Sequence, residues 1–196
     1  MVRCVAAPSP RRLPPDERRR QLVGIGLRML TERPITEITI DDVAREAGIS
    51  RSLLFNYFPS KREYHLAIIR AAARRVRRQT LEDLPSENRA AVMLDRFLAF
   101  LERRRDLYLS VLRDVGGADP DVAAITAQLR GEIVDGALAA LGRDDASPAL
   151  RLAISGWLAM VEDMGLAWAA APSSMERDAL VALLLGVLDD VLGRVE

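Results

Sequence analysis

The side chains of this chain that could do chemistry on a polyanion are concentrated between Thr39 and Lys61. They are hydroxyl, amide, guanidinium and ammonium groups, and no paired acid and base accompanies them, so they fit recognition better than bond breaking. Such groups contact base edges and phosphates in nucleic acids. The residues selected as DNA-contacting are Thr39, Ser50, Arg51, Ser52, Leu53, Asn56, Tyr57 and Lys61.

Two short helices around a glycine turn are needed to position these groups. Thr39 is a suitable N-cap for a helix over about residues 40–47, and Gly48 is suitable to end it. Ser50 is a suitable cap for a second helix over about residues 51–57. Two short helices joined in this way are typical of a helix-turn-helix, whose second helix enters the major groove of DNA.

The spacing of residue types in this segment resembles the TetR family of bacterial transcriptional regulators. The family pattern T-x-x-D-V/I-A-x-x-A-G-V/I-S-x-x-x-L-Y/F-x-Y-F-x-S-K is matched by Thr39, Asp42-Val43-Ala44, Ala47-Gly48-Ile49-Ser50, Leu54-Phe55, Tyr57-Phe58 and Ser60-Lys61. The match covers about residues 16–66. The resemblance implies a three-helix DNA-binding head, a linker helix, and a larger helical domain that binds a small molecule and forms a homodimer.

Base-edge chemistry assigns a separate contact to each exposed residue of the second helix. Arg51 can bind guanine, Asn56 can bind adenine or a phosphate, and Leu53 can touch a thymine methyl group. Lys61 begins the next helix, where an ammonium group and free backbone N–H groups favour a phosphate. Thr39 has the alternative role of a helix cap alone.

Three positions in the segment depart from the usual family pattern. Asp41 stands where relatives often have Arg, Leu53 where they often have Thr, and Phe55 where they often have Tyr. We place Phe55 in the small core of the head. The positively charged pair Arg11 and Arg12 lies in a Pro-rich N-terminal arm that can reach phosphates or the minor groove.

Composition excludes several classes of chemistry. The chain has one cysteine, Cys4, and one histidine, His65, which leaves no intrachain disulfide, no His/Cys metal cluster and no Cys–His catalysis. We therefore expect no metal, no cofactor and no enzymatic activity, and we interpret His65 as a packing or helix-surface residue. Residues 1–78 contain 17 Lys and Arg against 8 Asp and Glu, and residues 79–196 contain 11 against 20. This asymmetry suits polyanion binding at the N-terminal end.

Neither a signal peptide nor a membrane span is predicted. The first 16 residues are Pro-rich and lack an apolar core. Residues 152–171 are mostly apolar, but Glu162 and Asp163 in their middle are costly in a bilayer. We expect a cytoplasmic protein that has no membrane partner.

The whole chain reads as all-α, because period-two alternation is absent and Ala, Leu, Arg and Glu dominate. Four parts are expected: a flexible basic arm over 1–15, a helix-turn-helix domain over 16–60, a linker helix over 61–84, and an effector-binding and dimerisation domain over 85–196. The first helix starts near Pro15 and ends at Pro34, and the capping pair Ser60 and Glu63 starts the linker helix. Later helices are expected over about 87–104, 106–115, 120–141, 148–171 and 174–195, with Asp119, Ser147, and Ser173 or Ser174 as caps.

The last helix is apolar on more than one face, which favours a dimer seam built from the last two helices. The arginine run is interpreted as solvated or paired with the acidic second domain; it comprises Arg70, Arg74, Arg75, Arg77 and Arg78. Methionine and aromatic side chains suit an adaptable ligand pocket, although the same pattern suits ordinary core. The candidate ligand-binding residues are Met93, Phe97, Phe100, Tyr108, Trp157, Met160, Glu162 and Met164, with Trp168 as a further candidate lining residue.

The sequence leaves open two roles for Glu162 and Asp163. A carboxylate that faces a pocket favours a cationic or hydrogen-bonding ligand, and a carboxylate at the dimer seam pairs with an arginine. The resulting expectation is a ligand-responsive regulator of transcription, a repressor, that binds a palindromic operator on double-stranded DNA as a homodimer and is released by a small-molecule effector. The alternatives are an effector-independent or activating DNA-binding protein of the same fold, and a helical enzyme or lipid-binding module, which no residue pattern supports.

Overall fold

The structure, a computed structural model, describes residues 13–109 and 119–195. All regular elements within these ranges are helices, so the all-α expectation is correct. The α-helices are α1 Pro15–Met29, α2 Ile40–Ala47, α3 Arg51–Tyr57, α4 Lys61–Leu81, α5 Arg89–Tyr108, α6 Pro120–Ala140, α7 Pro148–Ala170 and α8 Arg177–Val195, and the 3-10 turns are η1 Ile35–Glu37 and η3 Pro172–Ser174.

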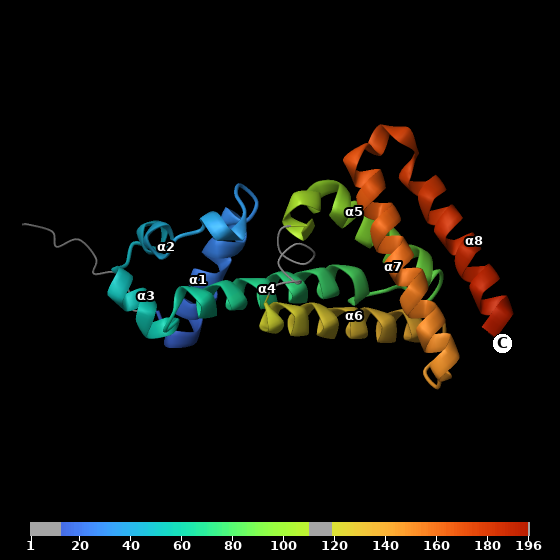
Figure 1. The fold of residues 1–196 in the computed structure, drawn as a ribbon, viewed down its shortest axis with the longest axis horizontal. Helices are drawn as coiled ribbons and strands as arrows, with labels where there is room; N and C mark the ends of the chain where they lie inside the picture. The colour runs from blue at the N-terminus through green and yellow to red at the C-terminus, as the bar shows by residue number, and fades with distance from the viewer. Residues whose placement is uncertain (1–12, 110–118, 196) are drawn as a thin grey trace, which may run out of the picture.

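The molecule is elongated, with a small helical head at one end and a larger helical body at the other (Figure 1). Helices α1, α2 and α3 form the head, and α4 runs from the head into the body. Helix α6 packs along α4, while α7 and α8 pack as a pair at the far end. The chain arrangement therefore places the expected DNA-contacting helix and the expected dimer helices at opposite ends.

Local side-chain chemistry fixes where the short helices of the head begin. The Thr39 and Ser50 hydroxyls accept hydrogen bonds from the backbone N–H groups of Asp42 and Leu53, at 3.1 and 3.2 Å. Each bond satisfies an N–H group that has no partner inside its own helix. Helix α2 ends at Gly48, whose φ of 64° lies in the left-handed region that glycine adopts without a steric penalty. Both predicted helices are confirmed with their predicted bounds.

The same rule sets the starts of the longer helices. Ser60 accepts from the N–H of Glu63 at 3.1 Å and begins α4, while Asp119 and Ser147 cap α6 and α7. The predicted last helix, however, begins late. Pro172–Ser174 form η3, and α8 starts at Arg177, so neither Ser173 nor Ser174 is its cap.

Two further predicted boundaries need correction. Helix α1 ends at Met29, before Pro34, because the chain turns at Leu30 and the Thr31 hydroxyl donates a hydrogen bond to the carbonyl of Arg28 at 2.7 Å. The break expected after residue 104 is a kink inside α5, where Arg104 has the non-helical φ and ψ of −142° and 29°. The remainder of the predicted helix over 106–115 extends beyond the described residues.

The hydrophobic core of the head continues into the body along α4. Leu22, Val43, Leu54 and Phe58 are buried in the head, and the same cluster of contacting residues extends to Leu129 of α6. A second cluster joins α5, α6, α7 and α8. Because α4 belongs to the first cluster over most of its length, a tilt of α4 must displace the head.

Tyr64 fastens the head to α4. Its side chain is fully buried, its hydroxyl donates to the carbonyl of Leu22 in α1 at 2.8 Å, and its ring meets Phe58 edge-on at 5.0 Å. Burial raises the pKa of the Tyr64 hydroxyl above its usual value, so this hydroxyl remains a hydrogen-bond donor. Gly26 of α1 lies against the same hydroxyl and against Ile68, since a Cβ atom there would be 2.7 Å from the Tyr64 hydroxyl oxygen and closer still to the Ile68 side chain. The close approach of α1 and α4 therefore needs a glycine.

Candidate nucleic-acid interface and ligand cavity

Helix α3 has one buried side and one side open to solvent. Leu54 and Phe58 are fully buried, and Phe55 is half-buried against the core of the head. The outward side consists of exposed residues that carry the chemistry expected of a DNA-reading surface. These residues are Arg51, Ser52, Leu53 and Asn56.

Arg51 is held in place without DNA. Its guanidinium donates to the Asp41 carboxylate at 2.9 Å and lies over the Phe55 ring, 5.5 Å from the ring centre. The Arg51 and Asp41 side chains are 60% and 56% exposed. Exposed ion pairs contribute little to stability, so a base or a phosphate can replace Asp41 at small cost.

The hydroxyls of Thr39 and Ser50 are already engaged as caps. The Thr39 hydroxyl also donates to the Asp42 carboxylate at 2.7 Å, and the Ser50 and Ser52 oxygens lie 3.0 Å apart. The Thr39 bond, opposed by partial burial and aided by nearby Arg33 and Arg45, lowers the pKa of Asp42. Both caps fix the helix starts. The DNA contacts of Thr39 and Ser50 remain a prediction.

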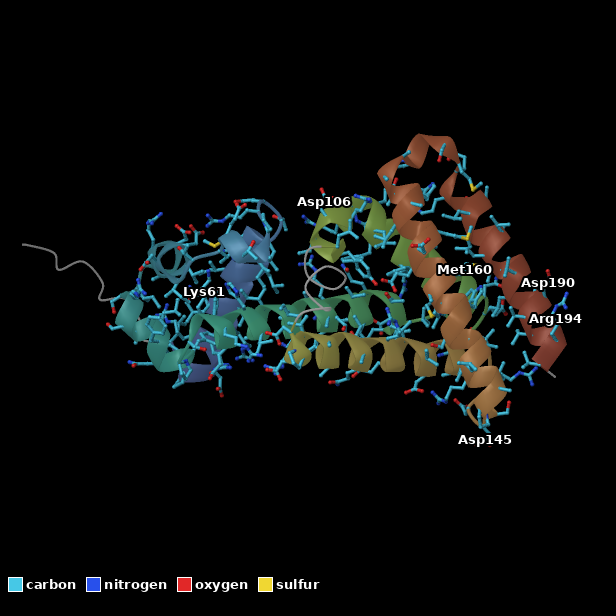
Figure 2. The ribbon with its side chains drawn as sticks, in the orientation of Figure 1. Lys61, Asp106, Asp145, Met160, Asp190 and Arg194 are labelled. Carbon is cyan, nitrogen blue, oxygen red and sulfur yellow. The ribbon has the colours of Figure 1, made fainter. Side chains whose placement is uncertain are left out.

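A second set of polar groups lies where α3 meets α4. The Lys61 ammonium is 3.4 Å from the carbonyl of Thr36, and Tyr57 is half-buried. Arg19 of α1 donates to the carbonyl of Tyr57 at 2.6 Å and stacks on the Phe58 ring, 4.4 Å from its centre. Arg19 was not selected from the sequence, because only the fold brings α1 beside the end of α3. Figure 2 shows Lys61 at the end of the molecule that carries α2 and α3.

The arginine run along α4 behaves as two groups. Arg77 pairs with Glu82 at 3.2 Å and with Glu132 of α6 at 3.6 Å, which is the predicted pairing with the acidic domain. Arg70, Arg74, Arg75 and Arg78 are exposed. His65 is half-buried and its Nε2 lies 3.1 Å from the carbonyl of Ile38, so it packs as expected; burial lowers its pKa.

A cavity opens in the body between α4, α5, α6 and α7. Its wall is mainly apolar and includes Val76 of α4, Leu129 of α6 and Val161 of α7. A free volume of about 70 Å³ remains inside, which exceeds the space one water needs. Mostly apolar cavities with a few convergent polar groups are the usual form of ligand sites.

Thr80 of α4 supplies a polar group at the buried side of this cavity. Its residue is 3% exposed, and its hydroxyl oxygen has no hydrogen-bond partner among the described residues. A buried hydroxyl without a partner costs about 1–3 kcal/mol. A ligand atom or a water in the cavity can remove that cost.

An ion pair forms part of the cavity wall nearer to solvent. Arg130 of α6 and Glu162 of α7 are 3.3 Å apart, and their side chains are 59% and 19% exposed. Glu162 therefore faces the cavity rather than a bare outer surface of α7. Asp163, its neighbour, is exposed.

The predicted ligand residues divide between the cavity and the core. Met93, Phe97, Tyr108 and Glu162 line the cavity. Phe100 and Trp157 do not line it. Both are buried elsewhere in the core, and Trp157 donates its Nε1–H to the carbonyl of Leu184 at 3.0 Å.

Met160, Met164 and Trp168 are also outside the cavity lining. Met160 and Met164 are partly buried against the second hydrophobic cluster, which joins α5 to α8. Trp168 donates its Nε1–H to the carbonyl of Met175 at 2.8 Å. Helical spacing placed these residues on the same helix as Glu162 but could not tell which side of the helix faces the cavity.

The cavity wall also contains residues that were not predicted to bind a ligand, among them the polar residues Thr80, Thr126 and Arg130. Thr80 lies one helical turn after Val76, and a lone hydroxyl in a buried stripe was the available signal. Arg130 lies in the helix predicted over 120–141, within the expected effector-binding domain, but only the packing of α6 on α7 brings it to Glu162.

An outer side of α7 and α8 leaves apolar groups uncovered in the single chain. Leu152 is 75% exposed and Leu183 is 46% exposed, while Gly156 and Gly186 are exposed and their Cβ positions are open. Figure 2 shows Asp190 and Arg194 on α8 at the end opposite Lys61.

Within the described ranges, no helix has the length and apolarity to cross a bilayer. The same residues contain no cluster of three or more His, Cys, Asp or Glu side chains suited to a metal ion. Arg11, Arg12 and Cys4 lie outside the described residues.

The fold and the capped helix pair define a helix-turn-helix DNA-binding protein. Residues 25–68 match the family described as "Bacterial regulatory proteins, tetR family", and residues 85–188 match "Tetracyclin repressor-like, C-terminal domain". The chain therefore belongs to the TetR family, whose members regulate transcription by binding DNA.

Relatives agree with this assignment. The chain is 27% identical over 178 residues to the HTH-type transcriptional activator FasR of Mycolicibacterium smegmatis, covering 87% of this chain and 80% of that protein. It has the fold of a tetR-family transcriptional regulator from Streptomyces coelicolor, with a TM-score of 0.77 and 23% identity over 92% and 82% of the two chains. It also has the fold of the regulator FadR from Bacillus subtilis in complex with stearoyl-CoA, with a TM-score of 0.66 and 13% identity over 86% and 96%.

Proposed function

We propose that this protein is a ligand-responsive repressor that binds a palindromic operator as a homodimer and leaves it when an effector fills the cavity. The observation that carries the proposal is the outward side of α3, where Arg51, Ser52, Leu53 and Asn56 are exposed while Leu54 and Phe58 anchor the helix. Side chains of these types at the start of a second helix read base edges in the major groove.

The proposed DNA contacts include the flanking backbone. Lys61, Tyr57 and Thr39 are assigned to phosphates, and Ser50 and Ser52 to the backbone or to base edges. Arg19 joins this group because it lies beside the end of α3. We keep the four-part division at residues 1–15, 16–60, 61–84 and 85–196 as part of the proposal.

We propose that the protein dimerises through the uncovered side of α7 and α8. A single head covers few base pairs, and two-fold dimers place two recognition helices in successive major grooves. The exposed side chains of Leu152 and Leu183, with exposed glycines that permit close helix approach, support these two helices as the seam. We assign the exposed Asp163 to this side of the molecule.

Effector response is proposed to act through α4. Val76 and Thr80 of α4 are cavity residues, and Arg62 near its other end binds Asp119 and Asp121 at the start of α6, at 2.9 and 2.5 Å. A ligand that fits best when α4 is tilted shifts the dimer to that state and changes the spacing of the heads.

Fluorescence anisotropy tests the proposal with a palindromic fragment from beside the protein's own gene. We expect binding that weakens steeply with salt, because phosphate contacts release counterions, and a scrambled fragment of equal length should bind more weakly. Equal binding of both fragments would refute sequence-specific operator recognition.

An activating role is the second candidate, because the relative FasR is described as an activator. A reporter fused to the bound fragment separates the two. Loss of expression when the protein is supplied supports repression, and a rise supports activation.

A further inference from the structure

We propose that the cavity of the body takes a cationic amphiphile: a protonated amine with an apolar body, whose ammonium group binds Glu162 and whose distal oxygen, when present, bonds to Thr80. The inference rests on the proposed function, because it names the class of effector for the same cavity. Three observations carry it.

The first observation is the unequal exposure of the Arg130–Glu162 pair. The two side chains are 59% and 19% exposed. An arriving cation takes over Glu162 and releases Arg130 into water, where an arginine is well solvated. An arriving carboxylate takes over Arg130 and leaves the more buried Glu162 without a partner, which is the costly direction. The pair therefore selects against anions.

The second observation is the charge of the surrounding domain. Residues 79–196 contain 20 Asp and Glu against 11 Lys and Arg. Such an excess attracts cations and repels anions over distances beyond direct contact. The long-range field and the local ion pair therefore favour the same ligand charge.

The third observation is the orphaned hydroxyl of Thr80. It borders the cavity, it is 3% exposed, and it has no partner among the described residues. Thr126, the other threonine of the wall, already donates to the carbonyl of Ala123 at 3.0 Å. Thr80 therefore offers a hydroxyl to a ligand, and the mainly apolar wall of the cavity suits a hydrocarbon body.

A series of probes with equal chain length separates the charges. Octylamine, octan-1-ol and octanoate are titrated at pH 7 into the full-length protein by isothermal titration calorimetry. We expect octylamine to bind about tenfold or more tightly than octanoate, with the alcohol between them. Octanoate binding as tightly as octylamine, or no binding by any probe, overturns the inference.

Variants then locate the site. Glu162→Gln should weaken octylamine about tenfold, while Asp163→Asn, the matched loss of a carboxylate one residue along α7, should leave it unchanged. Equal loss in both variants contradicts binding at Glu162. If Glu162→Gln lowers the melting temperature too far for titration, Thr80→Val is used in its place. In Thr80→Val the protein should lose affinity for 8-amino-1-octanol but not for octylamine. An equal response of both probes contradicts the bond between the ligand oxygen and Thr80.

DNA binding in the same samples distinguishes this inference from the proposed function. Octylamine that binds through Glu162 without lowering operator affinity supports the ligand class and contradicts effector release. A non-cationic compound that releases DNA while no amine binds overturns the ligand class and leaves the repressor proposal standing.

Discussion

Arg51, which we propose contacts DNA, is held by neighbouring side chains. Its guanidinium is bound by Asp41 at 2.9 Å and steadied by the Phe55 ring. The Asp41 carboxylate places a negative charge beside Arg51, on the side of the head that we propose faces DNA. We interpret Asp41 as a holder of Arg51 that weakens overall affinity.

Asp41→Asn should therefore tighten operator binding by a few fold. The change removes a negative charge beside the DNA and frees Arg51 to bind a base or a phosphate. Anisotropy titrations at two salt concentrations measure it, and the gain should shrink at high salt. Glu17→Gln, a charge change in the first turn of α1, is the control for net charge alone. Weaker binding by Asp41→Asn would mean that Asp41 positions Arg51 for DNA.

His65 gives the molecule a stability that depends on pH. Burial lowers its pKa below the unfolded value of about 6.5. The unfolded chain therefore takes up this proton first as the pH falls, and stability falls with it. The contribution is complete above about pH 6.5 and is lost as the pH drops toward the folded pKa.

Urea unfolding of the wild type and His65→Gln between pH 7.5 and 5 tests this. His65 is the only histidine, so the wild type should lose more stability over this range than the variant. Parallel pH profiles for the two proteins would show that His65 titrates alike in the folded and unfolded states.

At the scale of the helix, a helix boundary was predictable from the sequence where the interaction that sets it lies within a few residues. Helices α2 and α3 were predictable because Thr39, Gly48 and Ser50 act on backbone groups a few residues away. The start of α8 was not, because the η3 turn over Pro172–Ser174 comes first and the Trp168 side chain, four residues before that turn, bonds to the Met175 carbonyl just after it. The end of α1 was predicted wrongly, because the chain turns at Leu30, before Pro34, the residue that was predicted to end the helix.

Two glycines of α1 should respond oppositely to alanine. A Cβ at Gly24 meets nothing within 4 Å, whereas one at Gly26 meets Ile68 and the Tyr64 hydroxyl, the latter at 2.7 Å. Gly24→Ala should raise the free energy of unfolding by up to about 1 kcal/mol through helix propensity. Gly26→Ala should lower it by about 1–3 kcal/mol through overpacking.

Chemical denaturation of both variants gives the comparison. A Gly26→Ala protein as stable as Gly24→Ala would show that α1 and α4 can separate without cost, and it would remove the rigid joint between head and body.

At the scale of the whole molecule, the cavity shows what the sequence could not specify. Met93, Phe97, Tyr108 and Glu162 were identified, because methionine, aromatic and intrahelical acidic residues are unusual enough to notice. Thr80 and Arg130 were missed, since their role exists only when four helices pack together. Trp157, Met160 and Met164 of α7, which are of the same types, pack in or against the core instead. Helical spacing alone does not say which side of α7 faces the cavity.

The proposed dimer seam also belongs to the scale of the whole molecule. Leu183→Glu should convert the proposed dimer to a monomer, because a charge on an exposed side of α8 cannot be desolvated against a partner copy. Sedimentation velocity measures the change. Met175→Glu, at a residue 41% exposed just before α8, is the control and should remain dimeric. A Leu183→Glu protein that remains dimeric would place the seam elsewhere.

The most direct measurement compares operator discrimination by the wild type and by an Arg51→Ala/Asn56→Ala double variant. The ratio of affinities for the palindromic and scrambled fragments is obtained by anisotropy at one fixed salt concentration. The variant should lose most of that ratio, since each good base contact contributes about 1–3 kcal/mol of discrimination, while it keeps weak, salt-dependent binding. A double variant that folds normally and keeps the full ratio would contradict recognition through the outward side of α3.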